Sequence, residues 1–247
     1  ACEELASVTF AEGSKLKNVG AMAFHNCGKL ASVTFPSGCP LANIDASAFK
    51  LCGLTSIAIP AGVTNIGEQA FEECSSLASA TFEPDSKLEF IGSSAFCESG
   101  LTSVTIPAGV KRIEGYAFAE CGSLSEVTVL ATEPPMVPEH SNLFTGTVPG
   151  NPIATLTAIK VPVGSVDKYK AANGWRDYAN LFTDGSTAAE VDFEFDPTTG
   201  TIIDYKGEGG DFEIPATIGG VDVKAIGDNA FSHSNPLLLI KSVTIPA

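Results

Sequence analysis

Short segments in which apolar and small polar residues alternate return along the first half of the chain. In Ser56-Ile57-Ala58-Ile59 the isoleucines alternate with small residues. A period of two over so short a run predicts a strand with one buried face. Because segments with the same pattern recur, we expect their strands to line up as a parallel sheet along one face. The equivalent segments are 7–10, 32–35, 79–82, 103–106 and 126–129.

The residues after each strand predict the rest of one repeating unit. Pro60 and Gly62 favour a turn, because proline lacks an N–H group and glycine permits unusual dihedral angles. Val63 and Ile66 then predict a second short extended segment with both side chains pointing inward. Residues 68–74 can form a turn or two of helix at a corner. None of these pieces can bury its apolar face alone, so stacked units must cover one another.

A phenylalanine in the corner marks the period. It recurs at steps of 25, 22, 25 and 22 residues, at Phe24, Phe49, Phe71, Phe96 and Phe118. A period of this length is typical of a solenoid, in which each coil contacts only its neighbours. The sequence therefore predicts that these phenylalanines lie in the core. Leu143-Phe144 resembles one further, degenerate repeat.

The repeat resembles a known family. Leu101-Thr102-Ser103-Val104-Thr105-Ile106 fits the first half of a leucine-rich repeat, but Pro107 follows the strand and the usual asparagine is absent. The combination L-x-S-V-T-I-P-x-G-V-x-x-I-x-x-x-A-F-x-x-C resembles the BspA-like, Treponema-type repeats over residues 1–129, and again from about residue 212 to 247. This resemblance implies an α/β repeat solenoid, a right-handed leucine-rich-repeat coil with a parallel β-sheet on one face and short helical corners. It also implies a secreted or cell-surface bacterial protein that binds or adheres to a protein or glycan.

The sequence predicts two parts in the chain. Residues 1–182 form the first array, and about 163–182 resemble the terminal cap of such arrays, since an end coil needs a polar-faced cover. Residues 183–247 begin with a hairpin around 196–200 and restart a second, truncated array. Asp184–Thr187 has the composition of a flexible junction. The chain opens and closes in mid-repeat, so we expect it to be a piece of a longer array.

Five of the seven cysteines keep one place in the repeat. They are Cys2, Cys27, Cys52, Cys74 and Cys121, and Ser99 fills the slot where a sixth would fall. A slot that also accepts serine indicates a small buried position, where cysteine packs as a small hydrophobe. We therefore expect buried, free thiols in this slot. Cys39 and Cys97 are out of phase and are expected to be exposed.

Composition excludes several functions. The formal net charge of −15 lacks the basic footprint of a nucleic-acid-binding protein. No apolar run is long enough to predict a membrane-spanning helix. The chain contains no H-E-x-x-H, C-x-x-C or Walker motif, and its three histidines share no metal-ligand spacing. We therefore expect neither a cofactor, a metal nor a catalytic centre.

Three clusters remain candidates for binding. Asp192, Glu194 and Asp196 are interpreted as a solvated acidic strand, because they lack the pattern of a calcium loop. The aromatic and basic residues between Lys168 and Tyr178 fit an end cap better than a binding patch. The third candidate is the outward face of the predicted strands: Ser56, Ser79, Thr81, Ser103, Thr105, Glu126 and Thr128.

The outward strand face leaves three functional alternatives open. A concave sheet is where solenoids usually bind, which favours a non-enzymatic adhesion or binding protein. The same small Ser and Thr side chains also suit a tightly stacked ladder, and the protein would then be a spacer without a ligand of its own. A glycan-processing enzyme on a parallel β-helix is the third alternative, but it would need paired carboxylates that these positions do not supply.

Overall fold

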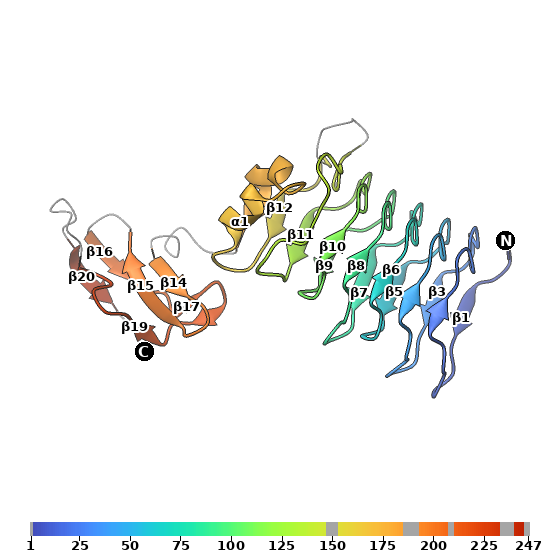
Figure 1. Cartoon of the computed structure of the whole chain (residues 1–247), viewed down its shortest axis with the longest axis horizontal. Helices are drawn as coiled ribbons and strands as arrows, with labels where there is room; N and C mark the ends of the chain where they lie inside the picture. Colours follow the sequence, from blue (N-terminus) through green and yellow to red (C-terminus); the bar gives the residue numbers. More distant parts are fainter. Residues whose placement is uncertain (1, 147–152, 185–192, 207–209, 233–239, 245–247) are drawn as a thin grey trace. The chain divides into compact units, whose positions relative to one another are not determined.

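The computed structural model describes residues 2–146, 153–184, 193–206, 210–232 and 240–244, and Figure 1 shows its elements. The chain folds into two compact units. Unit 1 contains residues 1–160 and 167–182, and unit 2 contains residues 161–166 and 183–247. The junction expected at Asp184–Thr187 lies, beyond Asp184, outside the described residues.

The alternating segments of unit 1 form a stack of parallel strands, as the sequence predicted. β1 pairs with β3, β5 with β7, and β9 with β11, which in turn pairs with β12. Backbone hydrogen bonds continue between these groups, as from Thr55 N to Ala31 O (3.2 Å) and from Thr102 N to Ala78 O (3.2 Å). The strands are β1 (Ser7–Thr9), β3 (Ser32–Thr34), β5 (Ser56–Ile59), β7 (Ser79–Phe82), β9 (Ser103–Ile106), β11 (Glu126–Val129) and β12 (Ala158–Lys160).

A second parallel sheet lies on the other side of each coil. Its five two-residue strands pair in chain order, and a bridge between Arg112 and Met136 extends them by one step. The inward residue of each strand is buried, as Ile66 is in β6, which agrees with the predicted second segment. The strands are β2 (Asn18–Val19), β4 (Asn43–Ile44), β6 (Asn65–Ile66), β8 (Phe90–Ile91) and β10 (Arg112–Ile113).

The corners of the coils are turns and not the short helices that the sequence predicted. The N–H groups of Gln69, Phe71 and Glu73 donate to the next coil, at 2.8, 2.7 and 2.9 Å. A helix would use the same N–H groups internally, so the bonds between coils replace it. Gln69 and Glu73 adopt φ angles of 57° and 58°, and their N–H groups point toward the next coil. These angles lie in the left-handed region, which non-glycine residues seldom occupy.

The corner phenylalanines form one continuous stack of rings through unit 1. Phe71 lies between Phe49 and Phe96, with centroid separations of 5.4 and 5.1 Å and nearly parallel planes. Phe144 continues the stack at 5.7 Å from Phe118, so the degenerate repeat keeps its place in the core. Phe71 has no exposed surface, which confirms its predicted core position.

The coils have two lengths, which alternate along the stack from the second coil onward. The longer coils carry two more residues after the strand, as in 83–87 compared with 60–62, and one more residue in the turn after the cysteine position. In the shorter coils that turn passes close beneath its neighbour. A Cβ atom on Gly53 would lie 2.2 Å from Gly28 O, and one on Gly100 would lie 2.3 Å from Ser75 O. Only glycine can occupy these two turns.

The last coil of unit 1 is covered by aromatic residues on and beside α1 (Val166–Ala171) and η1 (Arg176–Leu181). The Tyr169 hydroxyl donates to Ala131 O, and Trp175 Nε1 donates to Pro135 O, both at 2.8 Å. Tyr169 and Trp175 are fully buried. These two aromatic side chains therefore cover the end of the core and are not themselves exposed for binding.

Unit 2 has a small core of its own. β14 (Phe193–Asp196) and β15 (Thr201–Tyr205) form the predicted antiparallel hairpin, and β15 pairs in parallel with β19 (Ala225–Ile226). β16 (Gly210–Glu213) pairs in parallel with β20 (Ile240–Thr244), and β17 (Thr217–Ile218) pairs with β18 (Val221–Asp222). The core residues are Phe193, Ile202, Tyr205, Ile214, Ile218 and Ala230.

Candidate binding groove

The outward strand positions lie where the alternation places them. On β5, β7 and β9 the residues at these positions are exposed, whereas Glu126 and Thr128 on β11 are half-buried. The Glu126 carboxylate forms an ion pair with Lys160 at 2.8 Å. Most of this face is a flat ladder of short hydroxyl side chains, repeated from coil to coil.

This face is hollowed at the middle strands of the stack. A groove of about 520 Å³ lies over β7 and β9, and Ser79, Thr81, Ser103 and Thr105 form its floor. Four of the seven predicted positions therefore come together in one site, whereas Ser56, Glu126 and Thr128 do not line it. The volume falls within the range of about 300–1,000 Å³ that is common for ligand sites.

The groove results from the alternation of long and short coils. The end of β7 and the long loop after it contribute Phe82, Glu83, Pro84, Asp85 and Ser86 as one wall, and the short loop after β9 contributes residues 107–109. Leu130, which follows β11, lines the groove as well and is 49% exposed. The step between a projecting loop and a short one creates a hollow that neither loop forms alone.

Hydrogen bonds hold the long loop in position. Ala61 N of the preceding coil donates to Glu83 Oε2 at 3.0 Å, and Leu88 N donates to Ser86 Oγ at 3.4 Å. Asp85, between them, is exposed and has a φ angle of 57°. The equivalent positions in the two other long loops are Gly13 and Gly38, also at positive φ.

Sequence reasoning identified the floor of the groove but not its walls. The signal that could have found them is the alternation of 25- and 22-residue steps, because unequal coils must leave a step on the surface. Phe82 also differs from Ile59 and Ile106, which end the neighbouring strands. These differences become a site only once the coils are stacked in register.

Beyond the first coil, the cysteine slot is buried and its thiols are unreactive. Cys52 Sγ donates to Phe24 O at 3.0 Å, and Cys74 Sγ donates to Phe49 O at 3.1 Å. Burial raises the pKa of the Cys52 thiol to about 11 and that of Cys74 to about 12. A thiol is a nucleophile only as thiolate, so these residues are unreactive. Ser99 keeps the same ladder, because its Oγ lies 3.3 Å from Cys121 Sγ.

Three cysteines differ from expectation. Cys2 is exposed, because no described coil lies outside the first one to cover it. Cys39 and Cys97 are buried, although their phase suggested exposure. Cys39 turns inward beneath its long loop, toward Leu16 O. Cys97 follows Phe96 in the corner, where burial raises its thiol pKa to about 12.

Several charged side chains in the described parts form local pairs. Lys50 pairs with Glu72 and Glu73 at the corner, and the hydrogen bond with Glu72 raises the pKa of the Lys50 ammonium. Asp196 accepts hydrogen bonds from Thr198 N and Thr199 Oγ1, both at 2.8 Å, which lower its carboxyl pKa. Among the described residues no group of acids, cysteines and histidines could hold a metal ion. Asp192 and His233 lie outside them.

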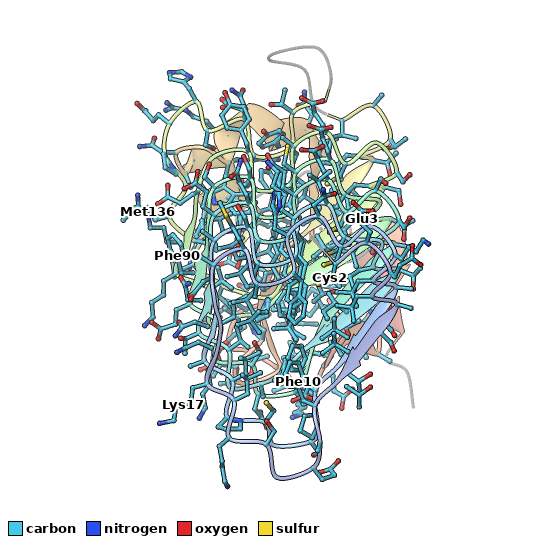
Figure 2. All side chains as sticks on the ribbon, turned by 90° about the vertical axis from the view of Figure 1, so that its right-hand side faces the viewer. Cys2, Glu3, Phe10, Lys17, Phe90 and Met136 are labelled. Atoms are coloured by element: carbon cyan, nitrogen blue, oxygen red, sulfur yellow. The ribbon has the colours of Figure 1, made fainter. Side chains whose placement is uncertain are left out.

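The outward ladder of the second sheet changes character along unit 1. It begins as asparagines, with Asn43 Nδ2 donating to Asn18 Oδ1 at 2.7 Å. It then passes to Phe90, Arg112 and Met136, which are neighbours in register. Figure 2, viewed from the N-terminal end, shows Phe90 and Met136 at one edge of the stack. None of these three residues lines the groove, whose lining comes from the strands and loops of the other sheet.

Comparison with known proteins agrees with the repeat architecture. Residues 1–129 match the family described as "BspA type Leucine rich repeat region", in 6 copies. No curated protein matches the chain. Within the described residues, no helix is both long and apolar enough to cross a membrane.

Three solved structures of bacterial proteins are similar to parts of the chain. The pneumococcal vaccine antigen PcpA is 20% identical, with a TM-score of 0.44 over 97% of this chain and 45% of its own. A leucine rich cell surface protein of Faecalibacterium prausnitzii A2-165 is 23% identical, with a TM-score of 0.31 over 70% of this chain and 63% of its own. A leucine-rich repeat protein of Bacteroides ovatus ATCC 8483 is 18% identical, with a TM-score of 0.27 over 65% and 56%. The chain thus spans about half the length of these proteins.

Proposed function

The chain belongs to the BspA-type leucine-rich-repeat family, and on that premise we propose that it is a non-enzymatic binding module whose groove over β7 and β9 receives a protein or glycan partner. The family resemblance implies a location at the cell surface or outside the cell. The partner would therefore be a host or bacterial surface molecule.

The observation that carries this proposal is the groove itself. On β1, β3 and β5 the strand face carries only short outward side chains, which offer little to distinguish one ligand from another. At the groove the repeat departs from this uniformity, with Phe82, Asp85 and Leu130 around a hydroxyl-lined floor. A concave site with apolar walls and a few polar groups is the common form of a ligand site.

The lining does not favour an enzyme. Its two carboxylates, Glu83 and Asp85, lie two residues apart on the same loop, whereas glycoside hydrolysis uses carboxylates on opposite sides of the scissile bond. Glu83 is also engaged with the Ala61 backbone. These features support binding without chemistry.

A matched pair of variants tests the proposal. Thr105→Arg fills the floor of the groove, and Thr34→Arg makes the same change in an identical Ser-Val-Thr segment outside it. Both threonines are exposed, so neither change should disturb the stack. Wild-type protein and both variants are applied to arrays of glycans and of purified host extracellular proteins.

The expected result is at least one ligand that binds the wild type and Thr34→Arg but not Thr105→Arg. If no ligand binds, or if Thr34→Arg abolishes binding equally, the groove is not the binding site. Absence of any ligand would favour the alternative in which the array is a structural spacer.

A further inference from the structure

We propose that the occupant of the groove is a protein segment that presents one apolar side chain flanked by lysine or arginine. This inference rests on the proposed binding function and narrows its partner class. It comes from two properties of the lining: its apolar walls and the sign of its charge.

The walls of the groove are apolar and partly accessible. Phe82, half-buried, and Pro84, exposed, form one side, buried Pro107 lies on the other, and Leu130 is exposed to 49%. An apolar side chain that enters here removes these surfaces from water, at about 25 cal/mol per Å² buried. Large exposed side chains that converge on a hollow are typical of an interaction site.

The charge of the lining is negative. It contains Glu83 and Asp85 and no lysine, arginine or histidine. Anionic groups on a ligand would therefore be repelled, whereas a cationic side chain at the rim would be attracted. Asp85 is the acid that distinguishes this loop, because Gly13 and Gly38 occupy its place elsewhere. At positive φ an aspartate has a higher conformational free energy than a glycine. Asp85 is therefore present despite a conformational disadvantage.

The floor suits a peptide better than a glycan. Sugar recognition needs many directed donors and acceptors, but the floor offers only short hydroxyls. One of them is occupied within the fold, since Thr81 Oγ1 donates to Ile57 O at 3.5 Å. A peptide needs few polar contacts here, because its side chain contacts the walls and its flanking cations contact the rim.

The experiment selects ligands from a phage-displayed library of random peptides. Phages are bound to the wild-type protein after depletion on the Thr105→Arg variant, so that only groove-dependent peptides remain. The expected consensus is an apolar residue with lysine or arginine within two positions. The strongest peptide is then synthesised with a fluorescent label, and its affinity is measured by anisotropy.

Two charge variants with equal net charge test the role of Asp85. Asp85→Gly installs the residue that the other long loops carry, and Glu12→Gln removes one exposed carboxylate from the first long loop, outside the groove. At low salt Asp85→Gly should lower the affinity for the peptide by about 2- to 5-fold, the effect of one exposed charge pair. Glu12→Gln should leave the affinity unchanged. The difference should vanish near 1 M salt, where screening acts within about 3 Å. Leu130→Ser should lower the affinity for the peptide at every salt concentration.

Several outcomes would overturn the inference. Selected peptides that are acidic or wholly polar would contradict the charge and apolar arguments, respectively. An equal loss in Glu12→Gln would mean that only the net charge attracts the peptide. If glycans bind in a Thr105-dependent way while no peptide is enriched, the proposed binding function stands and this inference fails. If neither class binds at the groove, both fail.

Discussion

Replacement of the central phenylalanine by alanine is the most direct test of the stacked core. Phe71 is fully buried and contacts two rings, those of Phe49 and Phe96. Loss of a buried phenylalanine side chain costs about 3–5 kcal/mol through lost burial and the remaining cavity. Each stacked pair contributes about 0.5–1.5 kcal/mol beyond burial, and two pairs are lost, so we expect Phe71→Ala near the upper end.

Phe24 provides the matched control. Its ring stacks on Phe49 at 5.2 Å, but it lies in the first corner and is half-buried. Phe24→Ala should therefore cost about half as much as Phe71→Ala. For a unit of this size about 1 kcal/mol corresponds to roughly 2–4 °C, so Phe71→Ala should lower the melting temperature by about 10–15 °C.

Trp175 makes the assay specific to unit 1. It is the only tryptophan in the chain, and it is buried at the cap. Its fluorescence during thermal and urea unfolding therefore reports on the integrity of the array. A melting temperature of Phe71→Ala within a degree of the wild type would refute the core assignment. Equal decreases in melting temperature in Phe71→Ala and Phe24→Ala would refute the argument that the number of neighbouring rings sets the loss.

Three further predictions concern the thiols and the junction. Under native conditions Cys74 and Cys121 should be alkylated far more slowly than the exposed Cys2; mass spectrometry that finds equal rates, or disulfides between neighbouring slots, would contradict this. In the folded protein the thiol pKa values, about 12 for Cys74 and about 11 for Cys52, exceed the usual value near 9. The thiols of the unfolded chain therefore lose their protons at lower pH, and the free energy of unfolding should decrease above pH 9. The decrease should reach at most about 1.4 kcal/mol per pH unit and thiol. Urea titrations of reduced protein check this, and a slope unchanged in Cys74→Ala would exclude that thiol as a cause. Limited proteolysis should cut near Asp184–Thr187 and release a stable 1–182 fragment; a resistant junction with joint unfolding of both parts would indicate one continuous array.

The sequence was most informative where one residue type has one physical role in every coil. The alternating strand segments and the corner phenylalanines predicted the sheet and the core, because burial every second residue and once per coil leaves a periodic pattern. The corner at 68–74 was predicted wrongly. Its local preference for helix is overridden by N–H groups that bond to the next coil, as Phe71 N does to Ala95 O.

The groove could be predicted only in part. Thr81 and Thr105 were found because outward strand positions follow from the alternation. Phe82, Asp85 and Leu130 were missed because the groove that they line lies between stacked coils of unequal length and cannot be seen in a single repeat. The burial of Cys97 was missed for a related reason: its cover comes from the corner turns, whose path local sequence does not reveal.

The alternation of long and short coils also sets the unit by which such an array can grow. Two coils contain 47 residues, the separation of Phe24 from Phe71, of Phe49 from Phe96 and of Phe71 from Phe118. Duplication of one such pair would lengthen the array while each glycine turn still meets the longer turn of its neighbour. The length of an outer loop can change without disturbing the ladders beneath it. The array can therefore acquire new surfaces one loop at a time while its interior stays the same.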